Sequence, residues 1–413
     1  MDTPITIDPA LVERHIMTLA SYGASHETGV SRAAYTPEWV AAQRQVADWF
    51  AEAGLTVWRD AVGNQWGRLA GTEGGPAIVT GSHIDSQLPG GRYDGALGII
   101  GGLLAVRALK ARFGQPRRSI DLVSFAQEEA SRLPGADLLA SRAIVGTLAP
   151  SEADTLRSYD GETFREVLAA VGLDADRIGE AARGDIDTFL ELHIEQGPVL
   201  EHEGIAVGVV DAITGSRTWR VTITGRADHG GACPMDLRRD PMVAAAAIIA
   251  EVLATASAMG RPAVTTVGRI LVEPNYPAIV PARVIVTVNA RHPDLAGGRA
   301  LFARHEATFA KVAAANPQLE LAWLGTPGGE PTSCDPGTVR LLEEVAREQG
   351  VPSKTMPSGA IHDCQVMAQR YKAAMLFVPS KDGRSHTPDE YTAPVELAAG
   401  IRVLAAALHR LAY

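Results

Sequence analysis

The stretch from Gly81 to Gly95, GSHIDSQLPGGRYDG, carries three side chains that can bind a metal ion: His83, Asp85 and Asp94. It follows the apolar run 77–80, which is typical of a buried strand, so we expect these residues to lie in a loop beyond that strand. Imidazole nitrogen and carboxylate oxygen are ligands for divalent transition metals. Because an isolated HxD motif is also typical of a polar surface turn, residues further along the chain must decide between the two interpretations.

Similar side chains follow later apolar segments. Glu128 and Glu129 come after the run 120–125, His193 lies in LELHIEQG, and His386 lies in GRSHTPDE. In α/β proteins ligands collect at the sheet edge where strands end, so we expect these segments to meet. Together they supply donors for two metal ions, which can polarise a carbonyl group and activate water. The candidate ligands are His83, Asp94, Glu129, His193 and His386. For each histidine taken alone, the alternative is a hydrogen-bonded core or surface imidazole.

Short strands and helices alternate through the first half of the chain. Pro37 and Gly54 mark the start and the stop of one helix, and the apolar stretch 95–113, directly after Asp94, predicts another. This βαβ order predicts an α/β fold with a mainly parallel sheet and helices on both faces. The expected strands are 56–59, 64–69, 77–80, 119–125 and 186–193, and the expected helices are 8–21, 37–53 and 95–113.

The pattern changes near residue 214. Residues 218–224 alternate between apolar and polar side chains, as in a half-exposed antiparallel strand. A β-α-β-β-α-β order, typical of a ferredoxin-like domain, is completed by a helix at 241–258, strands at 264–272 and 282–290, a helix near 296–315 and a strand at 319–324. We therefore expect an inserted lid or dimerisation domain at 214–327, a return linker at 325–337, and a catalytic domain formed by residues 1–213 and 328–413.

Composition narrows the possible partners and the cellular setting. The net charge of −10 and the lack of a basic patch argue against nucleic acid or an anionic membrane as a partner. Three cysteines without a CxxC motif fit a reducing cytoplasm rather than a disulfide framework. The N-terminus lacks the pattern of a signal peptide, and no apolar run is expected to reach the ~18 residues of a membrane span.

Six segments, in order along nearly the whole chain, resemble the hydantoinase/carbamoylase branch of the aminoacylase and carboxypeptidase-like metallopeptidase clan. This branch includes N-carbamoyl-L-amino-acid hydrolases, β-ureidopropionases and allantoate amidohydrolases. The resemblance implies a dinuclear metal-dependent hydrolase of linear C–N bonds other than peptide bonds. The six segments are 81–95, 124–146, 191–201, 225–241, 356–365 and 377–390.

The resemblance also assigns roles to the candidate ligands. It implies that Asp94 bridges two divalent ions, with His83 and His193 on one ion and Glu129 and His386 on the other. Nitrogen and oxygen ligands without thiolate suit zinc, manganese, cobalt or nickel.

Two carboxylates near these ligands have expected roles of their own. Glu128 matches the family's general base and acid, which takes a proton from water and gives it to the leaving nitrogen. A plain surface carboxylate is the alternative. Asp85 lies two residues after His83 and suits a carboxylate that orients this imidazole, with a turn-capping role as the alternative.

Other positions are expected around the substrate. His229 matches a residue that reaches the active site of the partner subunit and stabilises an oxyanion, which implies a working homodimer. Gln196, Arg291 and Gly359 match positions that hold the substrate, and the planar guanidinium of Arg291 would bind a substrate carboxylate. An ion pair between Arg291 and Asp294 is the alternative.

Three residues depart from the family's pattern. Ala278 stands where an asparagine usually helps to bind the substrate carboxylate, Ile361 stands where glycine is usual, and Cys233 replaces a threonine near His229. The expected activity is that of an N-carbamoyl-amino-acid amidohydrolase acting on a small-molecule amide or ureide. Allantoate-type ureide hydrolysis, N-acyl-amino-acid hydrolysis in a modified pocket, and a catalytically inactive metal-binding relative are the alternatives.

Overall fold

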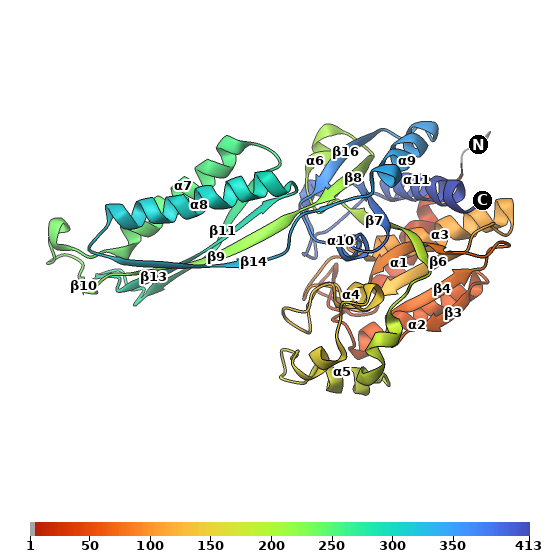
Figure 1. Cartoon of the computed structure of the whole chain (residues 1–413), viewed down its shortest axis with the longest axis horizontal. Coiled ribbons are helices and arrows are strands. Elements are labelled where there is room, and N and C mark those ends of the chain that lie inside the picture. Colours follow the sequence, from red (N-terminus) through yellow and green to blue (C-terminus); the bar gives the residue numbers. More distant parts are fainter. Residues whose placement is uncertain (1–4) are drawn as a thin grey trace. The chain divides into compact units, whose positions relative to one another are not determined.

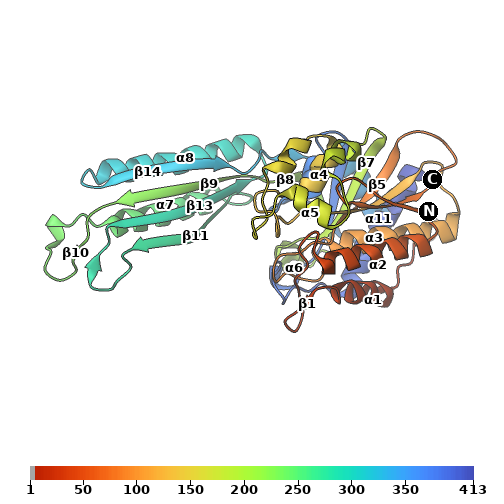
Figure 2. The same ribbon diagram turned by 90° about the horizontal axis from the view of Figure 1, so that it is seen from below.

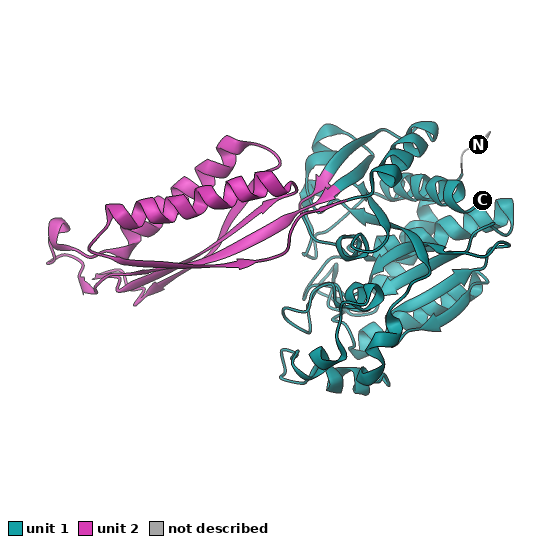
Figure 3. Ribbon diagram, in the orientation of Figure 1, with its two compact units in different colours: residues 1–211, 334–356, 360–413 teal, residues 212–333, 357–359 magenta. Residues whose placement is uncertain are grey.

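The computed structural model describes residues 5–413, which form two compact units (Figure 3). Unit 1 contains the chain up to residue 211 together with residues 334–356 and 360–413. Unit 2 contains residues 212–333 and 357–359, and is therefore an insertion into unit 1. The sequence pattern predicts its borders near 214 and 327.

Unit 1 is built on a mixed β-sheet whose four central strands run parallel, in the order β17-β7-β5-β6. On one side of the sheet, β6, β4 and β3 follow one another (Figure 1). Antiparallel strands extend it on both sides, with β8 beside β17 and the pair β4-β3 beside β6. Strand β16 pairs with β8. The strands are β3 (Thr56–Arg59), β4 (Gln65–Leu69), β5 (Ala77–His83), β6 (Ile120–Phe125), β7 (Ile186–Ile194), β8 (Val207–Ile213), β16 (Ser353–Ser358) and β17 (Lys372–Val378), with a separate pair β1 (Ala24–Ser25) and β2 (Gly29–Val30).

Helices cover both faces of this sheet. In β7, Leu192 packs against Gly101 of α3 and Gly400 of α11, whereas Glu191 accepts a hydrogen bond from the backbone N–H of Cys364 in α10. Successive strand residues point to opposite faces, so α10 lies on the face opposite α3 and α11. The helices are α1 (Pro9–Ala20), α2 (Pro37–Glu52), α3 (Ala96–Phe113), α4 (Leu139–Val145), α5 (Phe164–Ala170), α6 (Val199–Glu203), α9 (Pro336–Glu348), α10 (Asp363–Met367) and α11 (Pro394–Ala412), with short 3-10 turns η1 (Pro150–Asp154), η2 (Ala175–Ala181) and η4 (Lys381–Gly383).

Strand β5 is longer than the sequence pattern predicts. It continues to His83, so this residue is the last of the strand and does not lie in the following loop. Gly81 lies opposite Val123 of β6, where a Cβ atom would come within 1.9 Å of the Val123 carbonyl oxygen. This glycine therefore allows close approach of two strands, and the expectation that it opens a loop is wrong.

Unit 2 has the β-α-β-β-α-β order expected from the sequence. Its antiparallel sheet has the strand order β11-β13-β9-β14, and α7 and α8 pack side by side along it (Figure 2). The elements are β9 (Gly215–Thr224), β10 (Asp228–His229), η3 (Met235–Leu237), α7 (Pro241–Met259), β11 (Val264–Glu273), β12 (Ile279–Val280), β13 (Arg283–His292), α8 (Leu295–Ala315), β14 (Glu320–Pro327) and β15 (Thr332–Ser333).

The return from the insertion is more ordered than a linker. Strand β14 runs to Pro327, and β15 then pairs Thr332 and Ser333 with Ile213 and Ala212, where the insertion begins. The predicted loop at 325–337 is therefore wrong over much of its length, because backbone pairing extends into it.

Helix α7 is long and apolar enough, by length and composition, to cross a membrane. The expectation that no segment reaches this length is wrong, since Glu251 alone does not offset the alanine, isoleucine and valine around it. Its buried residues, including Ala244, Ile248 and Val252, belong to the core that α7 shares with the sheet. One side of α7 is therefore part of a globular core.

Candidate metal centre

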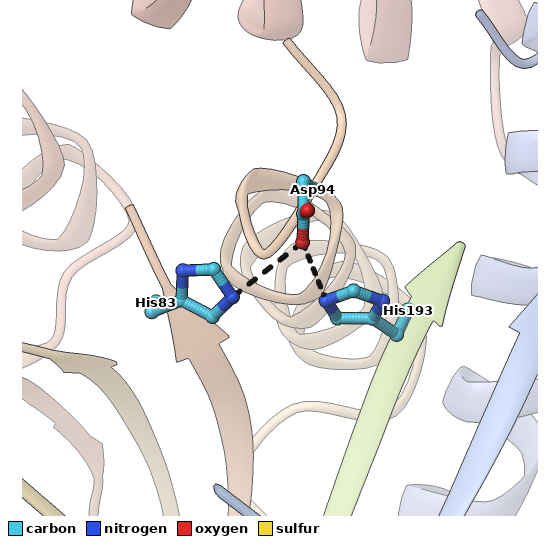
Figure 4. Close-up of side chains that lie close together, drawn as sticks. All are labelled: His83, Asp94 and His193. Carbon is cyan, nitrogen blue, oxygen red and sulfur yellow. Dashed lines mark ion pairs between the residues drawn. The ribbon is translucent and has the colours of Figure 1, made fainter. Parts of the chain in front are cut away.

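Three of the predicted ligands meet at one edge of the central sheet. His83 ends β5 and His193 lies near the end of the neighbouring parallel strand β7, while Asp94 lies just before α3 (Figure 4). Asp94 Oδ1 is 3.1 Å from His193 Nε2 and 3.6 Å from His83 Nε2. Because parallel strands end at the same edge, His83 and His193, which are 110 positions apart in the chain, both lie close to the same oxygen of Asp94.

The other oxygen of Asp94 faces the remaining two ligands. Asp94 Oδ2 is 3.2 Å from His386 Nε2, which in turn is 3.4 Å from Glu129 Oε1. Within the sets His83–Asp94–His193 and Asp94–Glu129–His386, the ligand atoms all lie within 4.8 Å of one another. The structure thus brings all five predicted residues together, with Asp94 common to both sets.

The donor set fits divalent metal ions. Glu129 Oε1 is buried and receives no hydrogen bond, so an oxygen with an unused lone pair faces the centre. The remaining donors are imidazole nitrogens and a carboxylate, a combination that suits zinc, manganese, cobalt or nickel. A third group, formed by Glu191, His193 and His362, is less suited, because both oxygens of Glu191 already accept hydrogen bonds from Ser82 and Cys364.

The ligands strongly influence one another's protonation. Burial would raise the pKa of Asp94, but hydrogen bonds from His193 and His386 lower it well below its usual range. The hydrogen bond to Asp94, together with the charge of Glu129, raises the pKa of His386 to about 9. Protons therefore occupy part of this site at neutral pH in the metal-free protein.

Metal binding is consequently expected to release protons, since a histidine must lose its proton before it can coordinate a metal. At about pH 7.5 calorimetric titration of the metal into chelator-treated protein should show net proton release, measured as a difference in heat between buffers of unlike ionisation enthalpy. The release should shrink as the pH rises through the His386 pKa of about 9. An unchanged release at higher pH would contradict this assignment of His386.

Glu128 lies beside the ligands and faces the same centre. Its side chain is buried, with 6% of its surface exposed, and its Oε2 is 3.8 Å from His83 Nε2. Burial raises the pKa of Glu128 well above its ordinary value, although the charge of His83 opposes this shift. The alternative of a plain surface carboxylate is therefore wrong, and the group has the raised pKa that proton transfer at neutral pH needs.

Asp85 links the segment that follows β5 to the segment that follows β6, which carries Glu128 and Glu129. The backbone N–H groups of Glu128 and Glu129 donate to its carboxylate at 3.0–3.2 Å. The Nδ1 atom of His83 is 3.0 Å from the Asp85 carbonyl oxygen and 3.5 Å from its carboxylate. The imidazole is thus oriented chiefly by the main chain of Asp85, whereas the sequence predicts this role for the side chain.

Two positioning residues are absent from the sequence prediction. Glu390 is buried and accepts hydrogen bonds from the N–H groups of Tyr93 and Asp94, at 2.8 and 3.0 Å. Gly91 leaves room for it, since a Cβ atom there would lie 2.0 Å from the Glu390 carboxyl carbon. Gln87 donates from Nε2 to Glu129 Oε2 at 2.7 Å. In the sequence, only its position four residues after His386 points to Glu390.

Gln196 contacts the ligands directly. Its Nε2 donates to Asp94 Oδ2 at 2.9 Å and lies 3.3 Å from His386 Nε2. Its backbone has a positive φ of 58°, which is uncommon for a residue other than glycine and is typical of functional sites. The residue predicted to hold the substrate therefore lies against the ligand set.

Arg291 and Gly359 both belong to unit 2 and contact each other. The Nη1 atom of Arg291 donates to the Gly359 carbonyl oxygen at 2.8 Å, and its Nε donates to Asn289 Oδ1 at 3.1 Å. The alternative ion pair with Asp294 does not form, because Asp294 instead caps α8 by accepting from Gly297 N–H.

His229 is exposed in unit 2, on the short strand β10. Its Nδ1 accepts hydrogen bonds from the N–H groups of Gly231 and Ala232, at 3.1 and 3.0 Å. With Nδ1 used as an acceptor, the ring carries its proton on Nε2 and presents that N–H as a donor. Ala278, one of the departures from the family pattern, contributes its carbonyl oxygen to Gly230 N–H beside this histidine.

The α/β unit thus positions a donor set that suits divalent metal ions, and a ferredoxin-like unit is inserted into it. The chain belongs to peptidase family M20/M25/M40, whose pattern matches residues 79–410. The family resemblance and the α/β fold class expected from the sequence are thereby confirmed.

Named relatives cover almost the whole chain. It is 36% identical to allantoate amidohydrolase of Bacillus subtilis, over 97% of both chains, and 37% identical to N-carbamoyl-L-amino acid amidohydrolase of Geobacillus stearothermophilus, over 95% of both. A crystal structure of a hydantoinase/carbamoylase family amidase from Burkholderia multivorans matches with a TM-score of 0.92 at 34% identity, covering 98% of both chains. The chain is thus an amidohydrolase of the branch that acts on C–N bonds outside peptides.

Proposed function

We propose that the protein hydrolyses N-carbamoyl amino acids, using two divalent metal ions held by the five ligands. Two ligand sets meet at opposite oxygens of Asp94, and buried Glu128 lies beside them. This arrangement is the main observation that supports the proposal. His83, Asp94 and His193 would hold one ion, and Asp94, Glu129 and His386 the other.

When bound, divalent ions polarise the scissile carbonyl group and lower the pKa of water. Glu128 takes the proton from the attacking water as the new C–O bond forms, and then delivers it to the leaving nitrogen as the C–N bond breaks. Arg291 binds the substrate carboxylate, and Gln196 and the Gly359 main chain help to hold the substrate. A carbamoyl substrate yields the free amine, ammonia and carbon dioxide.

The functional form would be a cytoplasmic homodimer in which His229 serves the partner's active site. Its exposed Nε2–H group supports a role as a donor to the oxyanion of the transition state. The outer side of α7 is suited to contact a second copy of the chain, because this apolar helix exposes apolar side chains there: Val243 is 57% exposed and Leu253 is 39% exposed. Large exposed apolar surfaces are typical of subunit interfaces.

Hydrolysis of an allantoate-type ureide is the second candidate, supported by 36% identity to an allantoate amidohydrolase. An N-acyl-amino-acid substrate is the third, because Ala278 cannot donate the side-chain hydrogen bond that asparagine would give.

A substrate panel with metal-reconstituted protein tests these proposals. It should contain N-carbamoyl-L-amino acids, N-carbamoyl-β-alanine, allantoate and N-acetyl amino acids, with ammonia and free amine measured separately. We expect both products from the carbamoyl amino acids, loss of turnover after chelation, and recovery with added metal. Ammonia from allantoate alone would favour the second candidate, and amine without ammonia the third. Turnover that survives chelation would contradict the metal-dependent mechanism.

A further inference from the structure

Unit 2 contains a cavity of about 470 Å³ beside Arg291. It is lined by Val264, by polar and charged side chains from β11 and β13, and by the main chain of Gly359. Its lining includes Thr266, Arg269, Thr287, Asn289, Arg291 and Gly359. The neighbouring β13 residues Val288 and Ala290 point into the core with α7 and α8, so the cavity lies on the sheet face that these helices leave open.

Arg269 reaches this open face because of an irregularity in β11. Pairing between β11 and β13 shifts between Val267 and Arg269, which leaves Gly268 as an extra residue. In a regular strand, Thr266 and Arg269 would point to opposite faces, but the bulge turns both toward the cavity. Val267 and Val272 both pack against the core although an odd number of positions separates them, as the bulge requires. Bulges of this kind often re-aim a side chain beside an active site.

The two arginines leave their positive charges uncompensated. Arg291 donates only to neutral oxygens, those of Asn289 and Gly359, at 3.1 and 2.8 Å. Arg269 lies opposite Thr287 on β13. Because Thr287 precedes Arg291 by four residues, the Cα atoms of Arg269 and Arg291 are on the order of 13 Å apart along the sheet. Within residues 5–413, no carboxylate forms an ion pair with either guanidinium. Two cations therefore border one open cavity that can receive an anionic molecule.

We propose that this cavity selects substrates with a second carboxylate, namely N-carbamoyl or N-acyl derivatives of acidic amino acids. Arg291 would bind the carboxylate next to the reacting nitrogen, and Arg269 would bind the acidic side chain. The assignment of the first carboxylate rests on the proposed function, whereas the presence of a site for a dianion does not.

Binding can be measured without turnover. Glutarate and its monoamide have the same shape, but only glutarate carries two charges. Calorimetry with the full-length chain should show glutarate binding about tenfold more tightly, as expected for one charge-assisted hydrogen-bonded pair. Arg269→Gln should abolish this preference, while Arg299→Gln, on helix α8, should retain it. Equal affinities, no binding of either compound, or a preference that survives Arg269→Gln would overturn the proposal.

Kinetics then separate this proposal from the proposed function. For N-carbamoyl-L-glutamate, Arg269→Gln should raise KM about tenfold with little change in kcat, and Arg269→Lys should restore most of the loss. N-carbamoyl-L-glutamine should be unaffected. If glutarate binding depends on Arg269 but no carbamoyl substrate is cleaved, the proposed function fails and the dianion site stands. Turnover of both substrates with no Arg269-dependent preference would contradict the dianion site alone.

Discussion

Replacing Glu128 by glutamine is expected to lower kcat by a factor of about 10²–10⁴, the usual contribution of a general acid or base. Glutamine has nearly the same shape, but it cannot take a proton from water or deliver one to the leaving nitrogen. Glu128 is buried beside the ligand set without completing either of the two ligand groups, so metal content should stay unchanged. The measurement is kcat on the best substrate, together with metal bound per chain and the thermal unfolding midpoint.

Glu129→Gln is the matched control, because it changes the adjacent residue in the same way. It should lose metal from the set that contains Asp94 and His386, since a ligand oxygen is replaced. The two variants thus separate loss of proton transfer from loss of metal. Near-normal kcat in metal-loaded Glu128→Gln would show that another group moves the proton.

His229→Asn should lower kcat by about 10²–10³, as for other losses of an oxyanion donor, if the Nε2–H group acts on the transition state. If His229 acts in the partner's site, mixing this variant with Glu128→Gln should restore activity. A hybrid dimer then has one site with an intact Glu128 and an intact His229. With random exchange of subunits, about a quarter of the wild-type activity should return.

The control for this mixture is Glu128→Gln combined with Glu129→Gln. Both changes fall in the ligand region of the same chain, so no arrangement of these subunits contains an intact site. Kinetic assays after subunit exchange, with the dimer fraction measured by light scattering, provide the readout. Failure of the first mixture to recover while hybrid dimers are present would place His229 in its own subunit's site.

The grouping of the candidate metal ligands can be predicted from sequence because they follow recognisable apolar segments and parallel strands end at a common edge. Strand limits are less predictable, as β5 shows: Gly81 looks like a loop residue, yet it pairs with Val123 inside the sheet, where the Val123 carbonyl oxygen leaves no room for a side chain. The range of β11 is also close to its prediction, but its bulge changes which side chains face outward. In the sequence, Gly268 within a strand pattern is typical of such a bulge.

Residues that hold the ligands are harder to predict. Glu390 binds the backbone of Asp94 across a separation of 296 residues, and Gln87 binds Glu129 across 42. Neither follows from a local period or a spacing rule, because tertiary packing alone brings the partners together. A lone glutamate or glutamine in a sequence is typical of the solvent-exposed surface, whereas here Glu390 is buried and Gln87 is half-buried.

The pairing of β15 with the end of β8 has a consequence for the history of this enzyme. The insertion leaves and re-enters at adjacent points, where Ser333 pairs with Ala212. A segment with neighbouring ends can be gained, lost or exchanged by recombination, because the host chain then loses little conformational entropy in closing around it. The candidate metal ligands lie in the host and both cavity arginines lie in the insert, so the two sets of residues can change independently. Selection can therefore change which substrates are accepted while the residues of the candidate metal centre remain unchanged.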